Sequence, residues 1–109
     1  MPDRDAMGRA TGWVELFCSQ RTTEDIRVEQ ERRGRTVTIV ERTAPRDPAT
    51  GDVWTRQPIA QLRLGADGTW SLFWPRHTGR WERYDERAVS DIRLLLAQID
   101  VDADGVFWG

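Results

Sequence analysis

Four of the six tryptophans lie in two short segments, and this clustering constrains the fold more than any other feature of the chain. Residues 69–84 read TWSLFWPRHTGRWERY, and Phe107-Trp108-Gly109 close the sequence. Tryptophan has a large apolar surface, which a small domain has to bury. We therefore expect the terminal aromatic residues to dock on the core, as a strand or as an anchor, and not to extend into water.

Alternating residues predict an antiparallel meander of about five strands. Residues 26–30 and 36–41 alternate on either side of an Arg-Gly turn, which is typical of a β-hairpin. Residues 58–64, 69–74 and 80–84 alternate as well, and glycine-containing turns separate them. Because each turn is short, we expect these strands to pair in the order in which they occur.

Two segments have the apolar spacing of amphipathic helices, a short one over Thr11–Gln20 and a longer one over Ala88–Ile99. The apolar residues at helical spacing are Trp13, Leu16 and Phe17 in the first segment and Val89, Ile92, Leu95, Leu96 and Ile99 in the second. Thr11 is suited to cap the first helix, and Ser90 or Asp85 the second. The predicted fold is α+β, with both helices covering one face of the sheet.

The length of 109 residues is near the commonest size of a single domain. We expect a flexible N-terminal tail over residues 1–12 and a single α+β domain over residues 13–109. The net charge of −2 provides no overall positive field that would attract nucleic acid or acidic lipid. All 16 basic residues are arginine, which excludes the Schiff-base and P-loop chemistry that needs lysine.

Cys18 is the only cysteine, so the chain can form neither an internal disulfide nor a cysteine-rich zinc site. It lies among apolar residues, which favours a buried, inert thiol over a thiolate paired with His77, the only histidine. The sequence has no apolar run of about 18 residues and no signal-peptide core. These features predict a soluble, cytoplasmic protein.

A family resemblance rests on the tryptophan-rich hairpin and the end of the chain. The residues that carry it are Ile59-Ala60-Gln61-Leu62-Arg63-Leu64, Trp70-Ser71-Leu72-Phe73-Trp74, Arg76, Trp81, Tyr84 and Phe107-Trp108-Gly109. Together they resemble a bacterial domain-of-unknown-function family, number 3024, over roughly residues 36–109. The resemblance implies a small bacterial domain and no assigned activity. Pro75 and Glu82 stand where the family often has Asp and His, so a function that needed those two would be in doubt here.

Arginines beside aromatic residues make the same hairpin a candidate binding surface. The candidate binding residues are Arg76, His77, Arg80, Trp81, Arg83 and Tyr84. Residues 56–87 hold six arginines against four acidic residues, which is a modest local excess of positive charge. Core packing explains most of the aromatic residues, and a base-stacking platform is the alternative. Alternation places Trp81 and Arg83 on one face and Tyr84 on the other.

The acidic segment after the second helix resembles the start of a calcium-binding loop. Asp100, Asp102 and Asp104 alternate, and Gly105 occupies the sixth position. The twelfth position, which supplies a bidentate Glu, would be residue 111, beyond the last residue of this sequence. The alternative is a turn that brings residues 106–108 back to the core. The sequence leaves open whether these aspartates bind a cation.

Two further charged groups are less specific. They are the hairpin tip with Arg32, Arg33 and Arg35, and the carboxylates Glu41, Asp47 and Asp52. The tip is typical of a solvated turn, and a phosphate contact is the alternative reading. No spacing rule supports a metal site among the three carboxylates. We therefore assign no metal ligand, catalytic residue or cofactor from the sequence.

The favoured function is a non-enzymatic binding or interaction module with an unidentified partner. One alternative is nucleic-acid binding through the arginine and aromatic face, and another is a metal-dependent hydrolase that uses carboxylates. The lone histidine, the lone cysteine and the lack of lysine argue against an enzyme. A protein or a nucleic acid remains open as the partner, a membrane is not expected, and a homo-oligomer is left open.

Overall fold

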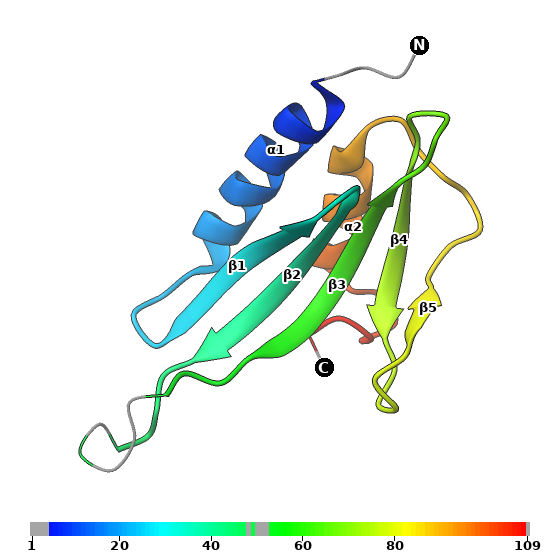
Figure 1. The fold of residues 1–109 in the computed structure, drawn as a ribbon. Helices are drawn as coiled ribbons and strands as arrows, with labels where there is room; N and C mark the ends of the chain where they lie inside the picture. Colours follow the sequence, from blue (N-terminus) through cyan, green and yellow to red (C-terminus); the bar gives the residue numbers. More distant parts are fainter. Residues whose placement is uncertain (1–4, 48, 50–52, 109) are drawn as a thin grey trace.

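The computed structural model describes residues 5–47, 49 and 53–108. Its elements are α1 (Ala6–Arg21), β1 (Ile26–Arg33), β2 (Thr36–Thr43), β3 (Gln57–Leu64), β4 (Trp70–Pro75), β5 (Trp81–Arg83) and α2 (Ile92–Val101). The strands form one antiparallel sheet in the order β1-β2-β3-β4-β5, so neighbours in sequence are neighbours in space (Figure 1). The predicted α+β meander with two helices is confirmed.

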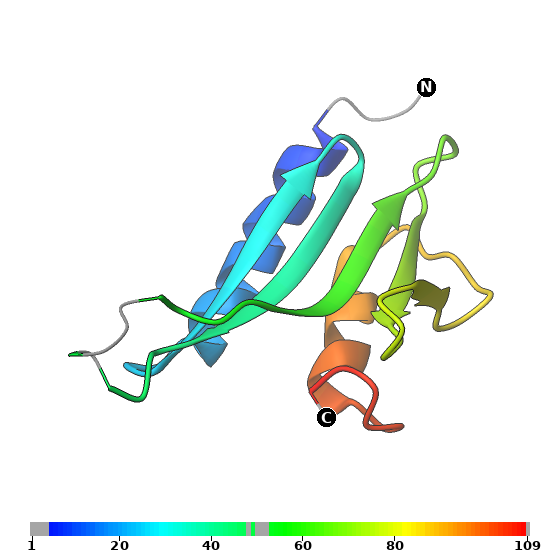
Figure 2. The ribbon, with the colours of Figure 1, turned by 60° about the horizontal axis from the view of Figure 1, so that its bottom comes forward.

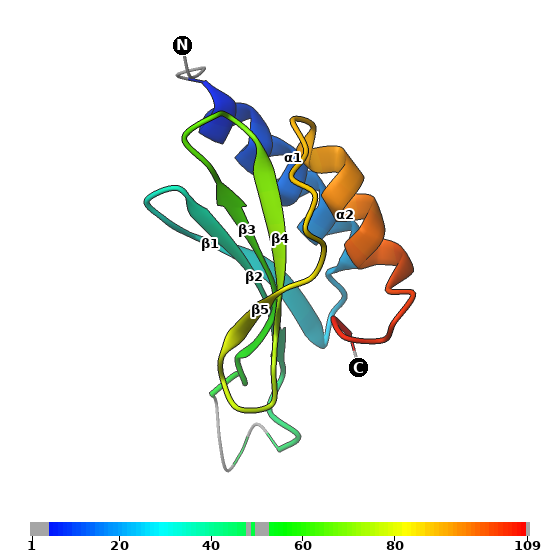
Figure 3. The same ribbon diagram turned by 90° about the vertical axis from the view of Figure 1, so that its right-hand side faces the viewer.

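Both helices lie on the same side of the sheet (Figure 3). Helix α1 packs on β1, and α2 packs against α1 and β4. No described helix or strand covers the opposite side, which we name the open face. Because side chains alternate along a strand, half of the sheet residues point into the core and the other half point to the open face.

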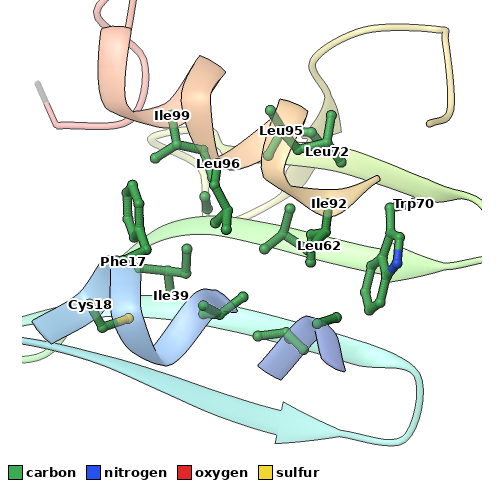
Figure 4. Packing of buried hydrophobic residues seen from close by; sticks show 14 of the residues in the cluster. Phe17, Cys18, Ile39, Leu62, Trp70, Leu72, Ile92, Leu95, Leu96 and Ile99 are labelled. Atoms are coloured by element: carbon green, nitrogen blue, oxygen red, sulfur yellow. The ribbon is translucent and has the colours of Figure 1, made fainter. Parts of the chain in front are cut away.

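Apolar side chains fill the space between the helices and the sheet (Figure 4). Val14 of α1, Ile39 of β2, Leu62 of β3 and Ile99 of α2 are all fully buried there. Every buried side chain in the described part of the chain is apolar. Burial of an aliphatic side chain of this size stabilises a fold by about 1.5–3 kcal/mol.

Helix α1 begins at Ala6, five residues before the predicted start at Thr11. Residues 6–12, which we expected to form part of a flexible tail, make its first turns; residues 1–4 lie outside the described residues. The Thr11 hydroxyl does not cap the helix and donates to the Gly8 carbonyl at 3.0 Å. Burial of Met7 and Ala10 explains the early start, since it extends the apolar stripe by two turns.

The inward face of α1 also differs from the predicted one. Val14, Phe17 and Cys18 are buried, whereas Trp13 and Leu16 are 42% and 48% exposed. The Arg93 guanidinium lies over the Trp13 ring, 4.8 Å from its centroid, and partly shields it. The spacing of Trp13, Leu16 and Phe17 therefore indicated the helix correctly but not its buried side.

Helix α2 is capped by Asp91, and not by Ser90 or Asp85 as the sequence suggested. The Asp91 carboxylate accepts a hydrogen bond from the Arg93 backbone N–H at 3.0 Å. Asp85 lies seven residues before the helix and accepts instead from the Arg87 backbone N–H. Over the part of the chain that the structure describes, no helix is both long enough and apolar enough to cross a membrane.

The segment after α2 curls back beneath the helix (Figure 2). Asp102 has a left-handed backbone, with φ at 47°, and its carboxylate accepts from the N–H groups of Phe107 and Trp108 at 3.1 and 2.9 Å. The Trp108 indole N–H donates to the Ile99 carbonyl, and Phe107 is 3% exposed. The predicted docking of the terminal aromatic residues is confirmed as an anchor, without a strand.

Candidate functional site

The open face is rich in arginine. Its charged residues, taken from the alternation and the side-chain contacts, are Arg27, Glu29, Glu31, Arg33, Arg42, Arg56, Arg63 and Arg83. Six arginines against two glutamates give this face a charge of +4. The whole chain carries −2, so the rest of it carries −6. The folded chain is therefore polarised, although its net charge is small.

Two of the six arginines neutralise the two glutamates. Arg56 makes a two-pronged contact with Glu31, and Arg42 lies between Glu31 and Glu29, with its Nε 3.0 Å from a Glu29 oxygen. The hydrogen bond from Arg56 lowers the pKa of Glu31. The other four form no ion pair with a carboxylate of the described residues, and they are Arg27, Arg33, Arg63 and Arg83. The pKa of the Asp85 carboxyl is nevertheless lowered, mainly by a hydrogen bond from a backbone N–H, and Arg83 lies close enough to contribute.

Arg63 is held in a fixed orientation at the centre of the open face. Its guanidinium lies 3.8 Å from the centroid of the Phe73 ring on β4. Its Nε donates to the Gln61 side-chain oxygen at 2.7 Å, and the Gln61 amide in turn donates to the Thr38 hydroxyl. These contacts fix the plane of the guanidinium before any partner arrives.

A hollow of about 590 Å³ surrounds this guanidinium. Arg33, Arg63 and Trp81 line it, together with the Arg56–Glu31 ion pair and hydroxyl and amide groups of β2 and β3. Trp81 is only partly buried. The hollow therefore combines positive charge with aromatic surface, on a scale suited to a small planar group.

Register places three of the unpaired arginines in a band across the sheet. Arg33 on β1 is opposite Thr36, Thr36 is opposite Arg63, and Arg63 is opposite Ser71 on β4. Arg83 on β5 reaches the same Ser71 with a hydrogen bond of 3.0 Å. The band runs perpendicular to the strands, and each arginine is two strands from the next, which is about 10 Å.

The candidate residues predicted from the sequence separate into two groups. Trp81 and Arg83 belong to the open face, as described above. Arg76, His77 and Arg80 lie in the turn between β4 and β5 and are exposed. The Arg76 Nε is 3.5 Å from a Glu82 oxygen, so this arginine is partly neutralised.

Tyr84 is on the opposite side of the sheet from Trp81 and has a structural role. Its ring packs edge to face on Phe107, with the centroids 5.1 Å apart. Its hydroxyl donates to the Asp104 carboxylate at 2.6 Å, and this hydrogen bond is the main reason that the pKa of Tyr84 is raised to about 12. We therefore do not include Tyr84 in the candidate site.

Sequence reasoning missed most of the open face. It considered the hairpin of residues 69–84 separately from the tip that holds Arg33, and it did not assign Arg63 or Gln61 to a binding surface; these three residues come from other strands. A signal was present in β1, where every second residue is charged and Val28 lies between the first two: Arg27, Glu29, Glu31 and Arg33. Such alternation places charged residues on the side that a helix does not cover.

The three aspartates of the calcium-like segment have separate structural roles. Asp100 pairs with Arg21 at 2.6 Å, Asp102 binds the N–H groups of the anchor, and Asp104 accepts from Tyr84. Within residues 5–47, 49 and 53–108, no three His, Cys, Asp or Glu side chains gather in a way that could hold a metal ion. The turn that returns to the core is therefore the better description of this segment.

The other charged groups noted in the sequence separate as well, since Arg33 of the hairpin tip belongs to the open face whereas Arg35 does not. At the hairpin tip, the Arg35 guanidinium donates to the carbonyls of Leu64 and Gly65, so it ties β2 to the next turn. The Asp47 carboxylate accepts from the Ala49 N–H. Asp52 lies outside the described residues.

Cys18 is 5% exposed, and burial raises the pKa of its thiol to about 12. The thiolate is the nucleophilic form of cysteine, so very little of the reactive species is present at neutral pH. No other cysteine exists in the chain. The placement of Cys18 agrees with the inert thiol that the sequence predicts.

We expect Cys18 to resist labelling by a thiol reagent in the native protein at about pH 8, because the folded state both shields the thiol and keeps it protonated. In denaturant, one thiol per chain should react at once. A time course of absorbance with a chromogenic disulfide reagent measures both rates. Native labelling as fast as that of the unfolded chain would contradict the buried placement of this residue.

Comparisons with known proteins give one match. The model of a family described as Domain of unknown function (DUF3024) matches residues 3–109. No curated protein and no solved structure matches the chain.

Proposed function

We propose that this chain, which belongs to the DUF3024 family of unknown function, is a non-enzymatic binding module that docks an anionic partner on its open face. The observation that carries the proposal is the charge of +4 on that face of a chain whose net charge is −2. We place the module in the cytoplasm, as the composition predicts, and in a bacterium, as the family resemblance implies.

Short-range electrostatics favour such a partner. At physiological ionic strength the screening length is about 8 Å, so a bound anion is influenced mainly by the charges of the face it touches. The acidic excess of the chain lies elsewhere, for example at Asp100 in the last turn of α2 and at Asp104 beyond it. An anionic surface therefore meets a locally positive protein, and the opposite charges also speed association.

The arginines that form no ion pair with a carboxylate are the ones that hold the partner. Arg42 and Arg56 are occupied by ion pairs with Glu29 and Glu31. Arg33, Arg63 and Arg83 keep N–H groups that can donate hydrogen bonds to an anion. We expect these three side chains to dominate the affinity.

Retention on immobilised heparin tests the proposal. We expect the protein to bind a heparin column at about pH 7 and low salt and to elute with added salt, although its pI of about 5.4 predicts no retention. Arg63→Gln should elute at lower salt, because it removes one positive charge from the open face. The salt concentration at elution is the measured quantity.

Arg87→Gln is the matched control, since it removes the same charge from an exposed side chain outside the open face, paired with Asp85. Its elution should match that of the unmodified protein. Passage of the unmodified protein through the column at low salt, or an equal shift from both substitutions, would refute an anion-binding open face.

A further inference from the structure

Resting on the proposed function, we infer that the anionic partner is a single-stranded nucleic acid, with an unpaired base stacked on the Arg63 guanidinium and its phosphates along the arginine band. Three features of the open face support this inference: a pre-formed stacking plane, a partly exposed tryptophan beside it, and cations spaced across the sheet. The first two match the bases of a nucleotide chain, and the third matches its phosphates.

The guanidinium of Arg63 is the second layer of a stack whose first layer is an aromatic ring of the sheet. The Phe73 ring lies on one face of the Arg63 guanidinium, at 3.8 Å from the ring centroid. Arg63 also lines the hollow, so a base bound there lies beside this side chain. Guanidinium planes and aromatic rings are the groups on which proteins stack splayed-out bases. A base placed in the hollow therefore extends the stack by one layer.

The orientation of this plane is set in advance. The 2.7 Å bond to Gln61 and the stack on Phe73 restrain the guanidinium at its Nε and across its face. Burial also lowers the pKa of Arg63, which indicates that part of its hydration has already been lost. Both effects reduce the cost of ordering this side chain when a base binds.

Trp81 provides a second aromatic surface on the same hollow. It comes from β5, and the intervening strand β4 carries Phe73, so the two aromatic residues lie on adjacent strands of one face. Successive bases of a single strand are flexible enough to use separate surfaces, whereas paired bases keep theirs inside the duplex. The open face therefore favours a single strand over a double helix.

The band of Arg33, Arg63 and Arg83 fits the phosphates of such a strand. It crosses the sheet over about 20 Å, four strand spacings, and within the described residues no carboxylate pairs with any of the three. A polar groove of positive charge flanked by stacking groups is the usual arrangement in proteins that bind single strands. An acidic peptide would use the charges of the band but not the stack.

Fluorescence anisotropy with labelled oligouridine and oligothymidine, each about twelve nucleotides long, tests the inference. We expect at least one of them to bind more tightly than a duplex of the same length. The logarithm of the binding constant should fall with the logarithm of salt concentration with a slope of about −2, as expected for three phosphate contacts. Polyglutamate at equal charge should compete poorly.

Arg63→Lys separates stacking from charge, because lysine keeps the positive charge and lacks the planar group. We expect it to weaken binding of the strand at least about fivefold and to leave retention on heparin nearly unchanged. Trp81→Ala should weaken the strand similarly, with partial recovery in Trp81→Phe. Arg87→Gln again serves as the control, and a thermal melt of each variant confirms that it is folded.

The outcomes distinguish this inference from the proposed function. If the protein is retained on heparin but binds neither oligonucleotide, the inference of a nucleic-acid partner is overturned, and the proposal of an anionic partner stands. Strand binding that Arg63→Lys and Trp81→Ala do not change, or that polyglutamate abolishes at equal charge, overturns base stacking. If the unmodified protein binds neither heparin nor the single strands, the proposed function, docking of an anionic partner on the open face, is overturned.

Discussion

Replacement of Phe107 by alanine should destabilise the protein by about 3–5 kcal/mol, the usual cost of removing a large buried aromatic side chain. Phe107 is 3% exposed and packs on Tyr84, so its loss leaves a cavity between the terminal anchor and the sheet. In a domain of this size the change corresponds to a fall in the melting temperature of more than about 10 °C. Urea denaturation and a thermal melt measure the two quantities.

Val101→Ala, in the same region, is the control. Its side chain is 73% exposed at the end of α2, so the free energy of unfolding should stay within about 0.5 kcal/mol of the unmodified value. The same small effect at Phe107 would mean that the anchor does not contribute to the core.

Asp102→Ala should cost about 2–3 kcal/mol. It removes a carboxylate that accepts two backbone N–H bonds, from Phe107 and Trp108, and leaves those donors partly buried. Alanine also has to adopt the left-handed backbone, with φ at 47°, which is unfavourable for a residue with a Cβ. Chemical denaturation of the purified variant gives the free-energy difference.

Asp102→Asn should lose less than the alanine variant, because asparagine tolerates this backbone conformation and keeps one oxygen acceptor. Asp100→Ala is the matched control from the same acidic segment. Its carboxylate is 64% exposed in an ion pair with Arg21, so we expect a loss below about 1 kcal/mol. Equal losses from Asp100→Ala and Asp102→Ala would contradict the special role of Asp102.

The strand order was predictable because three of the four pairings in this fold are local. Alternation in residues 26–41 and 58–84, with short glycine-containing turns inside the β1–β2, β3–β4 and β4–β5 hairpins, leaves few other ways to pair those strands. The β2–β3 connection, residues 44–56, is longer. The spacing of Ile92, Leu95 and Ile99 likewise identified α2. The start of α1 was missed because Gly8 and Gly12 interrupt a weak apolar stripe whose burial depends on the tertiary fold.

The candidate site was only partly predictable, because it is assembled from several strands. Trp81 and Arg83 are close together in sequence and were found, whereas their neighbours on the face come from β1 and β3. Nothing in the spacing of Gln61 and Arg63 indicates that Phe73 will stack against them, since that contact depends on the β3–β4 register. Tyr84 and Arg83 are adjacent in sequence, yet they point to opposite sides of the sheet.

The position of α2 and the anchor after the sheet has a consequence for synthesis on the ribosome. The strands emerge in the order in which they pair, so each hairpin can form as soon as its second strand leaves the exit tunnel. The apolar side of β3 and β4, with Leu62 and Leu72, is covered only after α2 and Phe107 have been made. At a translation rate of about 5–20 residues per second, this apolar surface stays uncovered for several seconds. During that interval the nascent chain is most prone to aggregate and to bind chaperones.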